Sequence, residues 1–128
     1  MILIDTSVII EFTRTGDPLM FKMFQENEGA IVGLIRAEVL HGSRNPKHIE
    51  NLRLALNSFR QLDFPEHLWD QVGINLSQLR LVGINVPFND VALATFALSQ
   101  NLPFWTRDKQ FLTIQKALPE LQFFDETI

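Results

Sequence analysis

Four acidic residues each lie where a short apolar segment meets a helix-like one. They are Asp5, Glu38, Asp90 and Asp108. Carboxylates that converge from different segments hold hard divalent cations, because such cations prefer oxygen ligands. The chain has no cysteine, and its histidines, His41, His48 and His67, follow no zinc-ligand spacing. The acidic set therefore favours Mg²⁺ or Mn²⁺ over zinc as the bound cofactor.

Each of the four acids also has an ordinary structural interpretation. Asp90 follows Asn89, and both residue types are common at the N-cap of a helix. Asp5 and Asp108 fit turn or cap positions for the same reason. Glu38 is harder to explain in this way, because a lone glutamate among alanine, valine and leucine loses solvation unless a positive or hydrogen-bonding group meets it. The joint placement of the four favours a functional site.

The segments around these acids alternate between short strands and helices. Short apolar runs predict strands at residues 2–4, 30–32, 103–106 and 121–124. Apolar spacing together with start and stop signals predicts helices at residues 8–12, 34–40, 47–59, 65–83, 90–98 and 108–115, with Ser7 as the cap of the first. This alternation predicts an α/β fold with a central, mostly parallel twisted sheet flanked by helices.

The predicted elements bring the four acids to one edge of that sheet. Asp5 ends the first strand, and Asp108 lies two residues after Thr106, at the end of a later strand. Open parallel sheets bind their ligands at the carboxyl ends of the strands. Glu38 lies on the helix after the second strand, and Asp90 begins a helix that is otherwise apolar. We expect all four side chains to point toward the same rim.

Length and composition indicate one globular domain spanning residues 1–128. The chain is 46% hydrophobic, which is enough to build a core. The absence of cysteine fits the reducing cytoplasm. The apolar start reaches a carboxylate too early for a signal peptide, and no apolar run approaches the ~18 residues of a membrane span. We expect a cytoplasmic protein.

The net charge of −4 is unusual for a protein that binds nucleic acid. Removing the four acids from the 15 acidic residues leaves 11, which equals the 11 lysines and arginines. Bound cations would offset the four carboxylates, so the acidity does not exclude RNA.

Four segments of the chain resemble those of a known family. They are Asp5-Thr6-Ser7, Arg36 to Gly42, Asn89-Asp90 before Ala92-Leu93-Ala94, and Thr106-Arg107-Asp108 before Phe111. In this order and at these intervals they are similar to the PIN-domain nucleases, and specifically to the VapC toxins. The resemblance covers nearly the whole chain and implies a three-layer α/β/α fold.

The resemblance also implies that the protein is a metal-dependent endoribonuclease. The quartet of Asp5, Glu38, Asp90 and Asp108 would hold one or two divalent ions, with Ser7 and Thr106 as supporting hydroxyls. Cleavage would be direct, by a metal-activated water attacking the phosphodiester in line. Family members often carry a further acid where this chain has Gln110, so no fifth ligand is expected there.

The partners implied by the resemblance are an RNA substrate, a small cognate antitoxin that inhibits the toxin, and often a second copy in a homodimer. Operator DNA would be bound only through the antitoxin. The apolar residues Phe12, Leu19, Phe21 and Phe24 are a candidate groove for the antitoxin or a dimer face.

Basic and aromatic residues have two interpretations each. Arg36, Arg107 and Lys109 flank the acids, where they could contact RNA phosphates or pair with acidic side chains. The chain has 11 phenylalanines and no tyrosine, which favours buried aromatics over rings that stack on bases. Trp69, Phe96 and Trp105 are accordingly expected in the core.

Two other functional classes remain open. A haloacid-dehalogenase-like phosphatase also begins with an aspartate at the end of a first strand, but it normally has a second aspartate where this chain has Ser7. A non-catalytic protein-binding module could retain the same fold. Metal binding too weak to detect at millimolar magnesium would favour that module.

Overall fold

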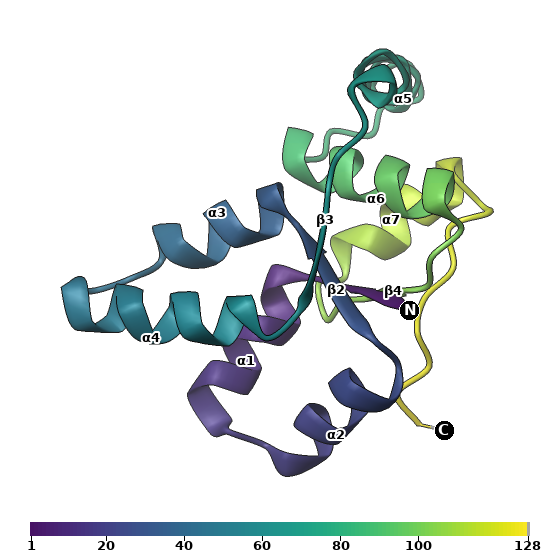
Figure 1. The fold of residues 1–128 in the computed structure, drawn as a ribbon. Coiled ribbons are helices and arrows are strands. Elements are labelled where there is room, and N and C mark those ends of the chain that lie inside the picture. Colours follow the sequence, from purple (N-terminus) through teal and green to yellow (C-terminus); the bar gives the residue numbers. More distant parts are fainter. Residues whose placement is uncertain (128) are drawn as a thin grey trace.

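The computed structural model describes residues 1–127 and has a four-stranded parallel sheet at its centre (Figure 1). The strands are β1 (Ile2–Ile4), β2 (Gly29–Val32), β3 (Arg60–Leu62) and β4 (Phe104–Trp105). Their order across the sheet is β3-β2-β1-β4, and every neighbouring pair is parallel. β1 and β2 are apolar and buried along their whole length, as expected for parallel strands covered on both faces.

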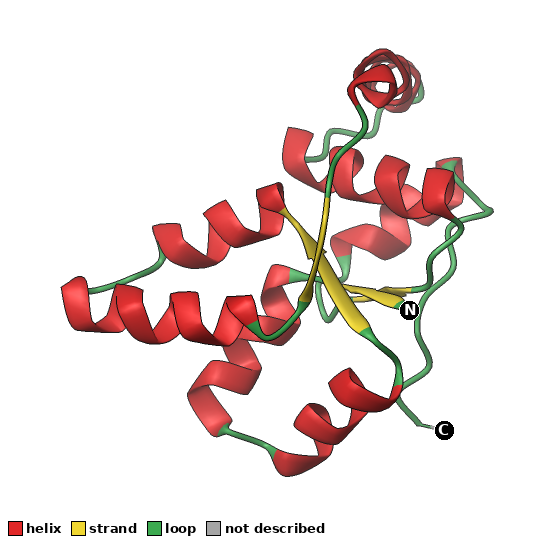
Figure 2. Cartoon of the chain, viewed as in Figure 1, coloured by secondary structure: helices red, strands yellow, loops and turns green. Residues whose placement is uncertain are grey.

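Helices connect the strands. They are α1 (Thr6–Thr15), α2 (Pro18–Glu26), α3 (Gly33–His41), α4 (Pro46–Asn57), the short 3₁₀ helix η1 (Glu66–Leu68), α5 (Trp69–Leu81), α6 (Phe88–Gln100) and α7 (Gln110–Ala117). The chain order β1, β2, β3 runs in one direction across the sheet, and the step to β4 reverses it. Right-handed crossovers therefore place α1 to α4 on one face and α5 to α7 on the other. Figure 2 shows helices on both sides of the sheet, which confirms the predicted α/β architecture.

Several helix ends follow the sequence signals. Asn101 ends α6 in the left-handed conformation with φ 53°, and Gly42 follows α3. The segment predicted as one helix at 65–83 consists of η1 followed directly by α5.

Two elements were not predicted, and one prediction was too long. β3 escapes the apolar pattern because Arg60 and Gln61 are exposed on this edge strand. The sequence predicted no helix where α2 begins at Pro18, and Leu19, Phe21 and Phe24 were used only as part of a candidate apolar groove. In place of a strand at 121–124, Phe104 and Phe123 form one isolated parallel bridge.

The core contains most of the large side chains that the sequence placed there. Phe96 and Trp105 are buried, as expected. Trp69 is the exception, because 37% of it is exposed. No helix within residues 1–127 combines the length and the apolar character that a membrane crossing requires.

Candidate active site

Asp5 is held by two hydroxyl groups at the carboxyl end of β1. Ser7 Oγ donates to Asp5 Oδ2 at 2.7 Å, and Thr106 Oγ1 donates to the same oxygen at 2.8 Å. Ser7 is therefore not the helix cap that the sequence suggested. It lies inside α1, and the N-cap is Asp5 itself, whose side chain makes no capping bond. Asp5 is only 5% exposed, so these two donors fix its orientation.

The environment of Asp5 changes its acidity in two directions. Burial raises the pKa of this carboxyl above its ordinary value, and the hydrogen bonds from Ser7 and Thr106 lower it in part. Both donors use Oδ2, so Oδ1 has no side-chain donor within residues 1–127.

Glu38 comes to the same edge from α3. Thr6 Oγ1 donates to Glu38 Oε1 at 3.3 Å. Burial and the nearby charge of Asp5 raise the pKa of Glu38, while hydrogen bonds from Thr6 and Asn89 lower it. A hydrogen-bonding partner was expected for this glutamate from the sequence, and Thr6 and Asn89 provide it. These two residues adjoin Asp5 and Asp90, so they connect Glu38 to both segments.

Asp90 lies in the first turn of α6 and is the most perturbed of the four acids. Burial raises its pKa to about 7, with further contributions from the charges of Asp108, Asp5 and Glu38. Like charges disfavour ionisation only over short range. The effect on Asp90 therefore shows that the structure brings the four predicted residues into one electrostatic cluster.

Asp108 lies in the turn between β4 and α7. Its backbone N–H donates to Thr106 Oγ1 at 3.0 Å, and its Oδ1 accepts from the backbone N–H of Gln110 at 2.9 Å. The cap interpretation of Asp108 thus holds for one of its oxygens. Thr106 contacts both Asp5 and Asp108, so one hydroxyl sets the positions of two acids.

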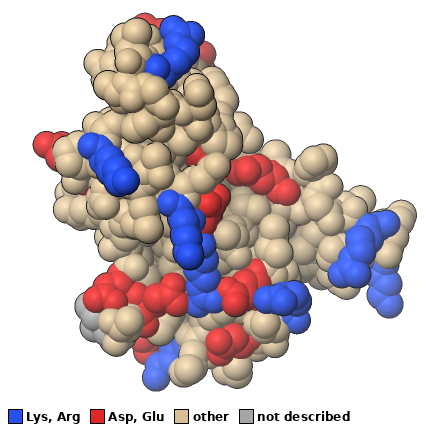
Figure 3. Space-filling view, turned by 180° about the vertical axis from the view of Figure 1, so that it is seen from behind, with Lys and Arg blue, Asp and Glu red and all other residues tan. Residues whose placement is uncertain are grey.

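Some of the acidic side chains lie in the middle of one face of the molecule, and others lie along its lower part (Figure 3). Those in the middle lie where the surface is hollowed between the α5 to α7 side and the arm formed by α3 and α4, with basic side chains next to them.

The donor set fits a magnesium- or manganese-like cation, because it consists of carboxylate oxygens. Within residues 1–127, no three His, Asp or Glu side chains lie close enough together to hold a metal ion between them. Magnesium takes few carboxylates directly and keeps several waters, so one or two of these acids could bind it with water as the other ligands.

Two polar residues of the site had been quoted in motifs without a role beside the acids, Thr6 with none and Asn89 only as a possible helix cap. Thr6 and Asn89 both donate to Glu38. The signal that could have found them is their position, since each directly adjoins a predicted acid.

The flanking arginines pair with protein groups. Arg36 donates to Asn57 Oδ1 at 2.6 Å. Arg107 pairs with Glu11 and with Glu126, the latter at 2.7 Å. These contacts support the structural interpretation of both arginines. The Arg107 pairs connect the turn before Asp108 to α1 and to the C-terminal segment.

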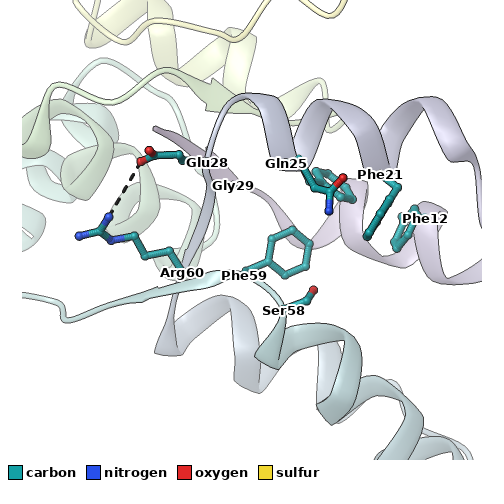
Figure 4. Close-up of a pocket in the computed structure, with 9 residues that line it drawn as sticks. Phe12, Phe21, Gln25, Glu28, Gly29, Ser58, Phe59 and Arg60 are labelled. Carbon is teal, nitrogen blue, oxygen red and sulfur yellow. Dashed lines mark ion pairs between the residues drawn. The ribbon is translucent and has the colours of Figure 1, made fainter.

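The predicted apolar groove exists, at the opposite edge of the sheet. Figure 4 shows Phe12, Phe21 and Phe59 lining a cavity of about 320 Å³, near the first residues of β2 and β3. Phe24 is buried at its base and Leu19 does not line it. An ion pair between Glu28 and Arg60, 3.9 Å apart, flanks the cavity. This groove is separate from the carboxylates.

The protein is an α/β domain with a parallel sheet covered by helices. Asp5, Glu38, Asp90 and Asp108 form an acidic rim at the carboxyl edge of that sheet. The chain belongs to the PIN domain family, whose sequence model matches residues 2–117. No curated protein matches the sequence.

Solved structures share this fold along almost the entire chain. VapBC2 from Rickettsia felis, bound to a DNA fragment from its promoter, is similar with a TM-score of 0.81 at 19% identity, covering 97% of this chain and 98% of that one. VapBC-1 from nontypeable Haemophilus influenzae has a TM-score of 0.79 at 22% identity, with 100% of both chains covered. DNA-bound VapBC from Salmonella typhimurium has a TM-score of 0.79 at 18% identity, covering 98% and 99%.

Proposed function

We propose that this protein is a metal-dependent endoribonuclease and the toxin of a toxin–antitoxin pair. The observation that carries the proposal is the cluster of Asp5, Glu38, Asp90 and Asp108, whose charges act on Asp90 at the carboxyl edge of a PIN-family sheet. Family membership supports a nuclease role in general. RNA as substrate and Mg²⁺ or Mn²⁺ as cofactor are the finer parts of the proposal.

The four acids would hold the cation, which when bound supplies an acidified water and stabilises negative charge on the phosphate. Asp5 contributes an oxygen held in a fixed orientation by Ser7 and Thr106. Glu38 and Asp90 would contribute oxygens from two other elements, α3 and α6. A bound cation would lower the pKa of Asp90, because its positive charge offsets the repulsion from the other three acids.

The two alternative classes fit the site less well. A phosphatase of the dehalogenase type needs a carboxylic acid two residues after its first aspartate, and here the Ser7 hydroxyl at that position already donates to Asp5. A binding module would have no use for four acids whose mutual repulsion costs folding free energy.

The catalytic proposal is tested by incubating the purified protein with a pool of structured cellular RNAs. The reactions contain Mg²⁺, Mn²⁺ or a chelator, and an Asp5→Asn preparation is made identically. Asp63→Asn, an exposed aspartate outside the cluster, is the matched control. We expect cutting that requires metal, persists in Asp63→Asn and is lost in Asp5→Asn. Equal cutting by wild type and Asp5→Asn would identify a contaminant and favour the binding module.

The proposed partner is a small antitoxin. The similar structures from Rickettsia felis and Salmonella typhimurium are VapBC assemblies bound to DNA. For this chain we propose that the antitoxin binds the apolar groove of Figure 4, where 46% of Phe21 is exposed. Operator DNA would then be bound through the antitoxin, and a cytoplasmic homodimer is the expected state of the toxin.

Coexpression with a small protein encoded next to this chain, where its gene has such a neighbour, tests the partner. We expect the two products to copurify, and Phe21→Glu to abolish copurification because it places a charge in an apolar groove. Leu54→Glu on α4 is the matched control, since Leu54 is exposed and lies outside the groove. Unchanged copurification of Phe21→Glu would contradict the groove as the antitoxin site.

A further inference from the structure

Four aromatic rings form a stack that runs from the core to the surface. From inside to outside they are Phe96, Phe64, Trp69 and Phe88. Their centroids are 5.6, 4.2 and 6.4 Å apart in that order, and successive planes differ by 26°, 23° and 12°. Phe96 is 1% exposed, Trp69 37% and Phe88 52%. The stack thus ends in two large rings that are open to solvent and nearly parallel to each other.

The outer rings are not required to attach α5 to the body. Val72 and Leu79 of α5 are buried, and Asn75 Nδ2 donates to Thr95 Oγ1 on α6 at 2.9 Å inside the interface. Hydrophobic stabilisation is roughly proportional to the apolar area removed from water. Trp69 and Phe88 are 37% and 52% exposed, so each stabilises the fold less than a fully buried ring of its size.

The open end of the stack lies beside the carboxylates. Phe88 and Asp90 are two residues apart in the first turn of α6, about 3 Å along the helix axis, and their side chains leave the helix on nearly opposite sides. Asn89 between them donates to Glu38. Phe64 follows the end of β3 by two residues, so it too lies at the carboxyl edge. An RNA strand bound at the acids would therefore pass around the start of α6 to bring its next bases to these rings.

We propose that Trp69 and Phe88 form a stacking surface for unpaired bases of a single-stranded RNA segment whose backbone passes the acidic site. This inference rests on the proposed ribonuclease function and names the substrate form that the site takes. Aromatic side chains beside a nucleic-acid channel bind successive bases through their faces, at about 1–3 kcal/mol per base, with little dependence on base identity. Duplex RNA offers no free base faces, so the surface favours loops and unpaired stretches.

Intrinsic tryptophan fluorescence gives a direct test. The chain has two tryptophans, and Trp105 is 1% exposed, so added RNA reaches only Trp69. The Asp5→Asn protein with Mg²⁺ is titrated with a ten-nucleotide oligoadenylate and with a ten-unit abasic ribose-phosphate oligomer, which has the phosphates but no bases. We expect oligoadenylate to quench the emission and the abasic oligomer to leave it unchanged.

Substitutions in the same background separate stacking from folding. Trp69→Ala and Phe88→Ala should each weaken oligoadenylate binding by about tenfold or more, since one stacked base is lost. Trp69→Phe retains a ring and should bind within a few-fold of the parent. Leu54→Ala, another exposed apolar residue, is the matched control and should bind as the parent does.

The outcomes distinguish the inference from the function. If wild type cuts RNA through Asp5 while Trp69→Ala and Phe88→Ala bind and cut as before, the stacking surface is wrong and the ribonuclease stands. If quenching occurs but no metal supports cutting, the ribonuclease is wrong and the stacking surface stands. If light scattering shows that Trp69→Ala turns a dimer into a monomer with unchanged RNA affinity, a second copy covers the surface and the inference is overturned.

Discussion

At the scale of single residues, Asp90 links the chemistry of the site to folding. Its pKa is raised from 3.8 to about 7, first by burial and then by the charges of Asp108, Asp5 and Glu38. Between these two pH values the native state retains a proton that the unfolded chain releases. Without divalent cations the free energy of unfolding therefore decreases as pH rises through this range, and the whole loss is present above pH 7.

Replacing Asp90 with asparagine removes that loss. In a chelator, Asp90→Asn should unfold with a free energy higher than wild type by about 1–2 kcal/mol at pH 8, allowing for the partial exposure of the side chain. The gain should vanish below about pH 3, where the wild-type carboxyl is protonated in both states. Urea unfolding at the two pH values measures it, with Asp63→Asn as control. A variant less stable than wild type at pH 8 would show that Asp90 is not repelled by its neighbours.

Thr106 provides a second test at this scale. Thr106→Val removes the donor to Asp5 and the acceptor for the Asp108 backbone N–H. Loss of the donor raises the pKa of Asp5 further, so the acidic limb of the pH–rate profile of RNA cleavage should move to higher pH. The rate at the optimum should fall by about 10- to 100-fold, as for other residues that orient metal ligands. Thr106→Ser retains the hydroxyl and should restore the profile. A lower rate without movement of the limb would assign Thr106 to packing alone.

At the scale of elements, the sequence predicted what depends on apolar pattern and strand ends. Asp5 and Asp108 were placed by the rule that ligands meet the carboxyl edge of a parallel sheet, and the structure brings them together through Thr106. β3 was missed because an edge strand of three residues, with Arg60 and Gln61 exposed, has no apolar pattern. Trp69 was misplaced because hydrophobicity does not reveal whether a ring faces the core or ends a stack at the surface.

The attachment of α5 to α6 depends on a buried polar pair, which gives a prediction for this element. Asn75 is 5% exposed and donates to Thr95, which in turn donates to the carbonyl of Val91 at 2.7 Å. Thr95→Val should lower the free energy of unfolding by about 1–3 kcal/mol, because the Asn75 amide is left buried without its acceptor.

Adding Asn75→Leu to Thr95→Val tests the cause of that loss. The double variant should regain much of the lost free energy of unfolding, since both polar partners are then apolar. Thermal unfolding of the two single variants and the double variant gives the coupling energy. Additive losses would mean that the hydrogen bond does not connect the two helices.

At the scale of the whole molecule, charge is concentrated where the function needs it. The net charge of −4 equals the charge of the four clustered acids, and the remaining acidic and basic residues balance. Within residues 1–127, five of the other eleven acids form pairs with lysine or arginine, for example Glu11 and Glu126 with Arg107. The four acids of the rim repel one another, so a cation bound there should stabilise the native fold.

Cation binding should be measurable as stability before any substrate is known. At ten times its dissociation constant, Mg²⁺ or Mn²⁺ adds about 1.4 kcal/mol to the free energy of unfolding, which raises the Tm by about 4–8 °C. Asp5→Asn and Asp108→Asn should reduce this shift, and Asp63→Asn should keep it. Differential scanning calorimetry at constant ionic strength, with Na⁺ replacing the divalent salt in the reference, excludes general screening. An equal shift in all four proteins would place the bound cation away from the rim and remove the basis for a metal-dependent nuclease.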